Sequence, residues 1–316
     1  MEARVKAEAR PGKLDIKAVF PFLGLALVCI FFWFMTEGAI FSSRSVSSMI
    51  NDGIYILLGS CGYMFLLAQG QVDFSIGSTM AVSCTCAALA ADIAPALAIP
   101  ASILPGLVIG LVNAFVIVKL RVNSFITTLS MQYLCNGLVL LISGGAVIGA
   151  PLAMLRWFTM PLKYALIAAF VVLGYYVFER TYYGKTCKAI GASQEAVRQS
   201  GANVTLLRMM PFVIMGAVAG FLGFISLIRT GSATNTTGST LMLNVMNAVL
   251  LGGLPWSGGT TSRFRSVCVG TLTMVILTCG MTLLGVNVAV QQLVRGGLFL
   301  AVIGVSYDRR NLKVIK

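Results

Sequence analysis

The sequence predicts an all-α integral membrane protein with about ten transmembrane helices. Hydrophobic residues make up 58% of its 316 residues, charged residues only 10%, and the mean hydropathy is +0.90. This composition leaves too little polar surface to cover a water-soluble domain of this size. The apolar residues also gather in runs of about twenty, the length that a helix needs to cross a bilayer. Strands of a barrel would alternate apolar and polar residues, and these runs do not.

The predicted spans lie between charged residues and clusters of Gly, Pro or Asn. Helices are expected because every backbone N–H and C=O in hydrocarbon must be paired within the segment. The predicted spans cover residues 18–36, 49–69, 76–92, 94–118, 124–143, 162–178, 209–229, 241–253, 266–284 and 288–306. Residues 70–77 and the span that begins at Leu241 are short or interrupted by polar residues, so nine or eleven spans also fit the sequence.

The positively charged residues predict which side of the membrane each loop occupies. With the N-terminus in the cytoplasm, ten spans place most Lys and Arg residues on the cytoplasmic side, as the positive-inside rule requires. Only Arg44, Arg156, Lys163 and Arg229 fall on the other side, and Arg295 lies near the last span. The net charge of +13 therefore needs no nucleic-acid partner, since the cations are spread over short loops.

This topology divides the chain into three parts. We expect a cytoplasmic N-terminal tail at residues 1–17, a transmembrane domain at residues 18–306 and a cytoplasmic C-terminal tail at residues 307–316. A charged cytoplasmic loop at residues 179–208 interrupts the transmembrane domain.

The sequence lacks the residues that usually drive transport or catalysis. A proton-driven carrier needs ionisable groups within its spans, but histidine is absent and nearly all acidic residues lie at span ends or in loops. Asp73 is the one acid that we expect within the membrane. Residues 184–186 resemble the end of a phosphate-binding loop, but that motif requires glycine where Glu179 stands. We therefore expect no enzyme activity, catalytic residue, metal site or cofactor, and any energy must come from another subunit.

The charged loop contains a segment that predicts a short helix of about two turns. Ser193 can cap its start, Glu195 favours the positive end of its dipole, and Gly201 can adopt the left-handed conformation that ends a helix. A helix this short is unstable alone because nucleation is unfavourable. It needs a surface to pack against, although a capped loop that merely joins two spans also fits these residues.

The same residues carry a resemblance to a known family. The segment from Glu195 to Gly201 resembles the EAA-x-x-x-G loop through which permease subunits of ABC importers dock onto their ATPases. The wider segment 189–201 is still more similar to the permeases of ribose and other simple sugars, whose pattern is AIGGNEEAARLSG. The residues to which the resemblance assigns coupling with the ATPase are Ser193, Glu195, Ala196, Val197, Arg198 and Gly201.

Three further segments resemble the same family, in order and at the expected spacing. Residues 70–78 resemble its pattern GGIDLSVGS, and residues 122–129 resemble VPSFIxTL. Residues 248–259 resemble AAVVLGGTSLSGG, so that the resemblance extends from Met49 to Ser306. The departures are Gln71 for glycine, Asn123 for proline, Asn244 for an acid, Asn247 for alanine and Thr261 for glycine. They leave the substrate open.

The resemblance implies a fold and a set of partners. The family fold is a helical bundle of two inverted-repeat halves with a short cytoplasmic coupling helix, and its pathway lies between two permease subunits. The implied partners are an ABC ATPase, an extracytoplasmic solute-binding protein and a second permease subunit, in a homodimer or a heterodimer. ATP and Mg²⁺ would be bound by the ATPase and not by this chain. The implied location is the bacterial plasma (inner) membrane, with both termini cytoplasmic.

For function, the resemblance favours the import of a small polar solute, foremost a monosaccharide such as ribose. Other solutes stay open, namely a nucleoside, a branched-chain amino acid or a sugar-like signal molecule. A secondary transporter is less well supported because ionisable residues are sparse within the spans. A structural membrane scaffold, the last alternative, would show no turnover.

Several polar residues in the membrane zone are candidates for the solute pathway or its framework. A carboxylate there is unfavourable, so Asp73 either accepts hydrogen bonds from Ser75, Ser78 and nearby backbone groups or faces a water-filled path. We expect Asp73 to fix the bend before the span at 76–92. Uncharged amides suit a neutral sugar, and the candidates of this kind are Asn113, Gln132, Asn136, Asn244 and Asn247. Each also suits a hydrogen bond between packed helices.

Small residues predict one close helix contact. Gly106 and Gly110 form a Gly-x-x-x-Gly pair in the first half of the chain, and Gly216 and Gly220 form one in the second. Such pairs let helix backbones approach closely. We favour packing within one subunit over a seam between two subunits.

Overall fold

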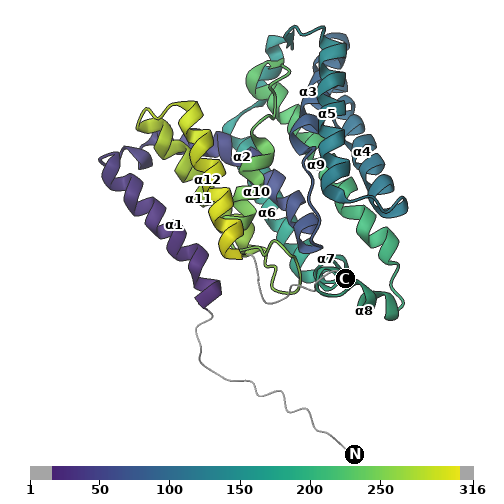
Figure 1. Ribbon diagram of the computed structural model, residues 1–316. Coiled ribbons are helices and arrows are strands. Elements are labelled where there is room, and N and C mark those ends of the chain that lie inside the picture. The colour runs from purple at the N-terminus through teal and green to yellow at the C-terminus, as the bar shows by residue number, and fades with distance from the viewer. Residues whose placement is uncertain (1–15, 307–316) are drawn as a thin grey trace, which may run out of the picture.

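The structure, a computed structural model, describes residues 16–306 as a bundle of helices (Figure 1). The helices are α1 (Ile16–Met35), α2 (Ser43–Ala68), α3 (Ile76–Ile93), α4 (Ala98–Ala114), α5 (Ser124–Ser143), α6 (Met160–Tyr175), α7 (Tyr182–Ala192), α8 (Gln194–Gln199), α9 (Val204–Thr230), α10 (Leu241–Leu251), α11 (Arg265–Leu283) and α12 (Val288–Ser306). The shorter helical elements are η1 (Ala39–Phe41), η2 (Pro95–Leu97), η3 (Phe115–Lys119), η4 (Leu152–Trp157) and η5 (Tyr176–Arg180). Apart from residues 16 and 17 in α1, the predicted tails at 1–17 and 307–316 lie outside the described residues.

Each of the ten segments predicted as a span is helical in the structure. The bounds of α5 and α12 are those predicted, whereas α2 begins at Ser43 instead of residue 49 and α9 at Val204 instead of residue 209. At the start of α2, Ser42 Oγ accepts a hydrogen bond of 3.3 Å from the Ser45 N–H. This cap starts the helix among polar residues, which the apolar periodicity alone does not include.

Among residues 16–306, seven helical segments are long and apolar enough to cross a membrane. They are Ser43–Ala68, Ile76–Ile93, Pro95–Lys119, Ser124–Ser143, Met160–Arg180, Val204–Thr230 and Arg265–Leu283. Shorter apolar helices in the same part of the chain are Val19–Met35, Leu241–Leu251 and Val288–Gly304. The fold is that of a helical membrane protein with several spans, while the number ten and the inverted repeat remain predictions.

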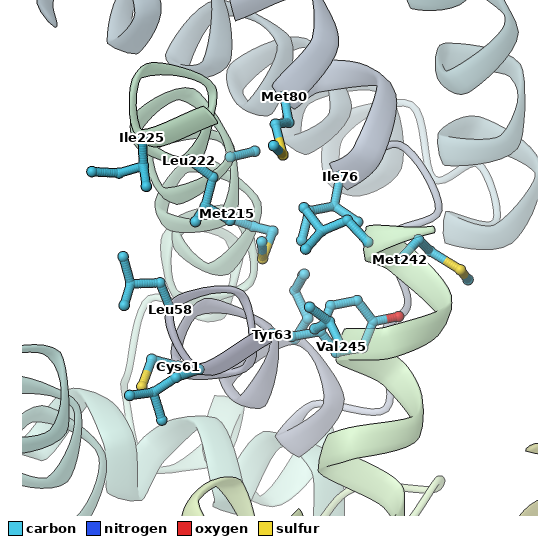
Figure 2. Close-up of a cluster of buried hydrophobic side chains, with 14 of the residues drawn as sticks. Leu58, Cys61, Tyr63, Ile76, Met80, Met215, Leu222, Ile225, Met242 and Val245 are labelled. Atoms are coloured by element: carbon cyan, nitrogen blue, oxygen red, sulfur yellow. The ribbon is translucent and has the colours of Figure 1, made fainter. Parts of the chain in front are cut away.

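The centre of the bundle is formed by α2, α3, α9 and α10 (Figure 2). Leu58 and Tyr63 of α2 meet Ile76 of α3, Met215 of α9 and Val245 of α10, and all five side chains are buried. Since lipid is as apolar as these side chains, close packing and not the exclusion of water holds this centre together.

The outer helices present large apolar side chains to their surroundings. Phe34 of α1, Leu141 of α5 and Leu173 of α6 are 75%, 82% and 60% exposed, and many neighbours are similar. Contiguous apolar surface of this kind is unfavourable in water but matches the interior of a bilayer. These faces agree with the membrane location expected from the composition.

The predicted glycine pairs lie against each other, one on α4 and one on α9. A Cβ atom on Gly106 would collide with the backbone oxygen of Gly216 and lie 2.8 Å from the Cα of Gly220. A Cβ atom on Gly220 would lie 2.8 Å from the carbonyl oxygen of Ser102. Packing within one subunit is therefore confirmed, since only glycine permits this backbone approach.

A short antiparallel pair of strands marks the end of α9 farthest from α8. β1 (Ile148–Gly149) pairs with β2 (Ser232–Ala233), with Ile148 opposite Ala233. The pair joins the connection between α5 and α6 to the connection between α9 and α10. The bundle is thus tied at this end by backbone hydrogen bonds between distant parts of the chain.

Candidate functional site

The short helix predicted in the charged loop is present as α8, at the lower end of the bundle in Figure 1. Ser193 Oγ accepts a hydrogen bond of 3.3 Å from the Ala196 N–H, which caps the start of the helix. Gly201, just beyond the helix, has a φ of 82°, which favours glycine because a Cβ atom is strained there. The predicted cap and left-handed glycine are both confirmed.

One side of α8 packs on its neighbours and the other side is open. Val197 is buried with Ile190 of α7 and Val204 of α9 in a small apolar cluster. Glu195 and Arg198 are exposed. The helix therefore offers a charged surface while its apolar face connects it to α7 and α9.

Three polar contacts fasten this region to the rest of the bundle. Lys188 Nζ of α7 lies 2.6 Å from Glu179 Oε2, and Glu179 Oε1 accepts a hydrogen bond of 2.7 Å from the Phe264 N–H just before α11. The charged side chains of this pair are only 10% and 17% exposed, so water screens them less than a surface pair. Gln69 Nε2, after α2, donates a hydrogen bond of 2.8 Å to the Leu207 carbonyl of α9. A displacement of α7 and α8 would therefore reach α2, α9 and α11.

A pair of stacked aromatic rings and a buried thiol provide further contacts between α7 and the α2 region. The rings of Tyr183 and Phe65 stack with their centroids 5.4 Å apart. Cys187 Sγ lies 3.2 Å from Gln69 Nε2. Burial raises the pKa of the Cys187 thiol, which keeps it protonated and unreactive.

Segments from two of the matched motifs meet at the end of α2. The Gly259 N–H donates a hydrogen bond of 2.9 Å to the Ala68 carbonyl. A Cβ atom on Gly191 or on Gly258 would collide with the same carbonyl oxygen. The glycines of motifs far apart in sequence thus allow three backbones to converge beside α8, which their spacing in the sequence does not reveal.

A first cavity, which we name the α8 cavity, lies beside α8 and the start of α9. It has a volume of about 840 Å³, and its lining includes the side chains of Arg121, Arg198 and Arg208. Gln194 and Asn203 also line it, and no acidic residue does so among the residues that the structure describes. This end of the bundle therefore presents a cluster of positive charge next to the helix predicted to dock a partner.

The polar residues around Asp73 come together at the start of α3, as predicted. Asp73 Oδ1 accepts hydrogen bonds from the Ser75 N–H at 2.8 Å and from Ser75 Oγ at 2.6 Å. Asn113 Nδ2 of α4 donates to Ser75 Oγ at 3.0 Å, and the Asp73 N–H donates to the Tyr63 hydroxyl at 3.3 Å. The prediction that Ser78 donates to Asp73 is wrong, because Ser78 Oγ donates to the Ser75 carbonyl, one helical turn back.

A second cavity, which we name the Arg295 cavity, lies at the opposite end of α9. Its volume is about 290 Å³, and it is lined by residues of α2, α3, α9, α10, α11 and α12. Arg229 Nη2 donates a hydrogen bond of 2.8 Å to Asp52 Oδ1, and the Arg229 guanidinium lies 5.2 Å from the centre of the Tyr55 ring. Asn244 lines the same cavity, and its Oδ1 atom is buried without a hydrogen-bond partner among the described residues.

Arg295 of α12 is the most enclosed charged group of this cavity, at 8% exposed. Its Nη2 atom lies 3.2 Å from Gln291 Oε1 and 3.4 Å from Thr278 Oγ1, and both partners are uncharged. Its Nε atom is buried without a partner among the described residues. Its carbonyl oxygen accepts a hydrogen bond of 3.1 Å from Asn247 Nδ2 of α10.

The remaining candidates from the sequence are divided between these sites and the surface. Asn247 is buried beside the Arg295 cavity, and its Oδ1 atom has no partner among the described residues. Gln132 is half-buried and Asn136 is exposed on α5, and neither residue lines either cavity. The structure does not bring these two amides to the other candidates.

The sequence candidates did not include three charged residues that line the Arg295 cavity. The charge distribution places Arg229 on the non-cytoplasmic side of the membrane and Arg295 near the last span, and it assigns neither residue to a site. The apolar pattern places Asp52 near the start of a span, whereas α2 begins at Ser43 and Asp52 lies inside it. The available signal was the presence of charged residues within apolar helices, which usually marks a pathway or a pair.

Comparison with known proteins identifies the family. The family model described as "Branched-chain amino acid transport system / permease component" matches residues 45–303. The chain belongs to this family. It is a multi-pass membrane protein, and as a permease component it moves a solute and is not itself an enzyme.

Individual relatives cover most of the chain. The L-arabinose ABC transporter permease protein AraH of Azospirillum brasilense is 34% identical over 82% of this chain and 80% of its own length. The L-arabinose transport system permease protein AraH of Escherichia coli K12 is 32% identical over 80% and 79%, respectively. The ribose import permease protein RbsC of the same strain is 27% identical over 79% and 81%. No solved structure matches the chain significantly.

Proposed function

We propose that this chain is the permease subunit of an ABC importer for a monosaccharide. The observation that carries the proposal is the similarity, over about four fifths of the chain, to permeases named for L-arabinose and ribose. The Arg295 cavity supports it, because a small cavity with hydroxyl, amide and charged side chains suits one sugar ring.

The proposed partners occupy opposite ends of the bundle. An ABC ATPase binds at α8 and at the arginines of the α8 cavity, on the cytoplasmic side, and it alone binds ATP and Mg²⁺. An extracytoplasmic solute-binding protein delivers the sugar at the end that holds the Arg295 cavity, and both termini are cytoplasmic. A second permease subunit, identical or different, completes the pathway.

The proposed coupling uses the contacts around α8. ATP-driven closure of the ATPases moves α8, and the buried Val197 transmits this movement to Ile190 and Val204. Since α9 begins at Val204 and ends beside the Arg295 cavity, one continuous helix connects the ATPase end to the solute end. The Glu179 and Gln69 contacts carry the same movement to α11 and α2.

The test is sugar uptake by the native host with and without this gene. Deletion should abolish the uptake of at least one labelled sugar among L-arabinose, D-ribose, D-xylose and D-galactose or their acidic derivatives, and the gene on a plasmid should restore it. Purified chain in proteoliposomes should transport nothing without its ATPase. Transport by the chain alone, driven by an ion gradient, would establish a secondary carrier and refute the proposal.

A further inference from the structure

The charges that line the Arg295 cavity do not balance. Three ionisable side chains line it, namely the carboxylate of Asp52 and the guanidinium groups of Arg229 and Arg295. Asp52 and Arg229 form a direct ion pair with a 2.8 Å contact. The positive charge of Arg295 has no such partner, because no acidic side chain among residues 16–306 lies within ion-pair distance of it.

Arg295 is also the deeper of the two arginines. The paired side chains of Arg229 and Asp52 are 32% and 40% exposed, so surrounding water can stabilise them. Arg295 is 8% exposed, and among the described residues its side-chain hydrogen bonds run from Nη2 to the uncharged Thr278 and Gln291. Asp52 attracts Arg295 only from beyond ion-pair distance. A buried charge without a counter-charge in contact is unfavourable, so its retention here points to an anion that binds transiently.

The unpartnered atoms around the cavity indicate a ligand with both an anionic group and hydroxyl groups. Arg295 Nε is a buried donor without a partner, and a guanidinium matches the planar geometry of a carboxylate. Asn244 Oδ1 is a buried acceptor without a partner in the described part of the chain, and it lines the same cavity. A sugar hydroxyl can donate to that oxygen while a carboxylate accepts from Arg295.

We propose that the solute of this permease is a sugar acid, a monosaccharide carrying one carboxylate, and that Arg295 binds this carboxylate. The proposal rests on the monosaccharide import proposed above and narrows its substrate class. One carboxylate matches the single unbalanced guanidinium, whereas a phosphate of charge about −1.5 to −2 would exceed it. The volume of about 290 Å³ is enough for one sugar ring.

The experiment compares sugars that differ in one carboxylate. The deletion strain carrying the wild-type gene is offered labelled D-galacturonate or D-galactose, D-glucuronate or D-glucose, L-arabinonate or L-arabinose, and D-ribonate or D-ribose. Gene-dependent uptake of one sugar acid should exceed that of its neutral counterpart about tenfold, the difference expected when a buried guanidinium gains a counter-charge.

Variants test whether Arg295 is the cause. Arg295→Gln should lower sugar-acid uptake about tenfold. Arg295→Lys keeps the charge but not the planar pair of donors, so it should lower uptake less, with membrane abundance measured for each variant. Asn244→Asp has nearly the same shape and adds the missing negative charge, so it should also shift the preference towards the neutral sugar. Arg156→Gln is the matched control, since Arg156 is exposed and lines neither cavity.

The outcomes separate this inference from the proposed function. Gene-dependent uptake of neutral sugars alone, or an unchanged preference in both Arg295→Gln and Asn244→Asp, overturns the sugar-acid inference and leaves monosaccharide import standing. If deletion changes the uptake of no sugar and no sugar acid, monosaccharide import is wrong and the inference is wrong with it.

Discussion

The α8 cavity and the Arg295 cavity lie at opposite ends of α9 and use arginine in different ways. Arg208 and Arg229 are 21 residues apart on this helix, which corresponds to about 30 Å. The α8 cavity is the larger, and its three arginines have no acid among the described lining residues. The Arg295 cavity is about a third of its volume and contains one ion pair and one enclosed arginine.

This difference between the two cavities indicates what each end of α9 can bind. Arg121 and Arg198 are exposed and remain hydrated while Arg208 is half-buried, and together they suit the acidic surface of a protein partner, which brings its own counter-charges. An enclosed arginine in a small cavity has lost its water, so it selects a small ligand by charge and shape. One helix thus separates a surface for a macromolecule from a site for a solute.

The largest effect is expected at the contact that holds α9 itself. Gly106→Ala should destabilise the protein by about 2 kcal/mol or more, because the added methyl group collides with the Gly216 backbone oxygen. Both cavities should be lost together, and thermal unfolding of the purified protein in detergent measures the change. Gly137→Ala on α5 is the control, since its Cβ atom would meet nothing within 4 Å. Equal unfolding temperatures for the two variants would contradict the α4–α9 contact.

A second change should impair the α8 end and spare the Arg295 end. In the double variant Glu195→Ala, Gly201→Ala, alanine at a φ of 82° is strained by about 1–2 kcal/mol, so docking of the ATPase should weaken about tenfold. The amount of ATPase that co-purifies and the ATP-dependent uptake should both fall, while membrane abundance stays constant. Gln199→Ala, also exposed on α8, should change neither. An undiminished complex from the double variant would count against α8 as the docking site.

The smallest effect is expected between the two ends, at Asp73. Asp73→Asn keeps an oxygen that can accept from Ser75 but removes the charge that strengthens both hydrogen bonds. A loss of about 1 kcal/mol should lower uptake roughly fivefold and reduce stability slightly. Asn136→Ala, exposed on α5, is the neutral control. If Asp73→Asn keeps full assembly and transport, the carboxylate is dispensable for the bend before α3.

The helices could be predicted from the sequence because lipid imposes a simple rule on apolar length. The bounds of α5 are set by local features, an Asn123 cap and the left-handed Gly144. The start of α9 was missed because the Asn203 side chain caps it, with Oδ1 accepting from the Leu206 N–H at 3.2 Å, ahead of the apolar run. Caps act on single residues, so averages over a window do not detect them.

The sites were predicted only where the partners are close in sequence. Asp73 and Ser75 are two residues apart, and a buried carboxylate there must find a nearby donor. Asn113 was named by residue type, but its bond to Ser75 depends on how α3 and α4 pack. The Arg295 cavity gathers side chains from six helices, and no local pattern reports such an assembly. Charged residues within apolar helices were its one available signal.

The first helix, α1, lies outside the segment that matches the family model. α1 ends at Met35, before the family match begins at residue 45. It packs along α11, where the Phe32 ring lies against Gly280. Hydrocarbon tails can replace such an apolar neighbour with little loss, because helix and lipid offer similar contacts. No residue of α1 lines either cavity, so a shortened chain that begins near Ser42 keeps every residue that lines them.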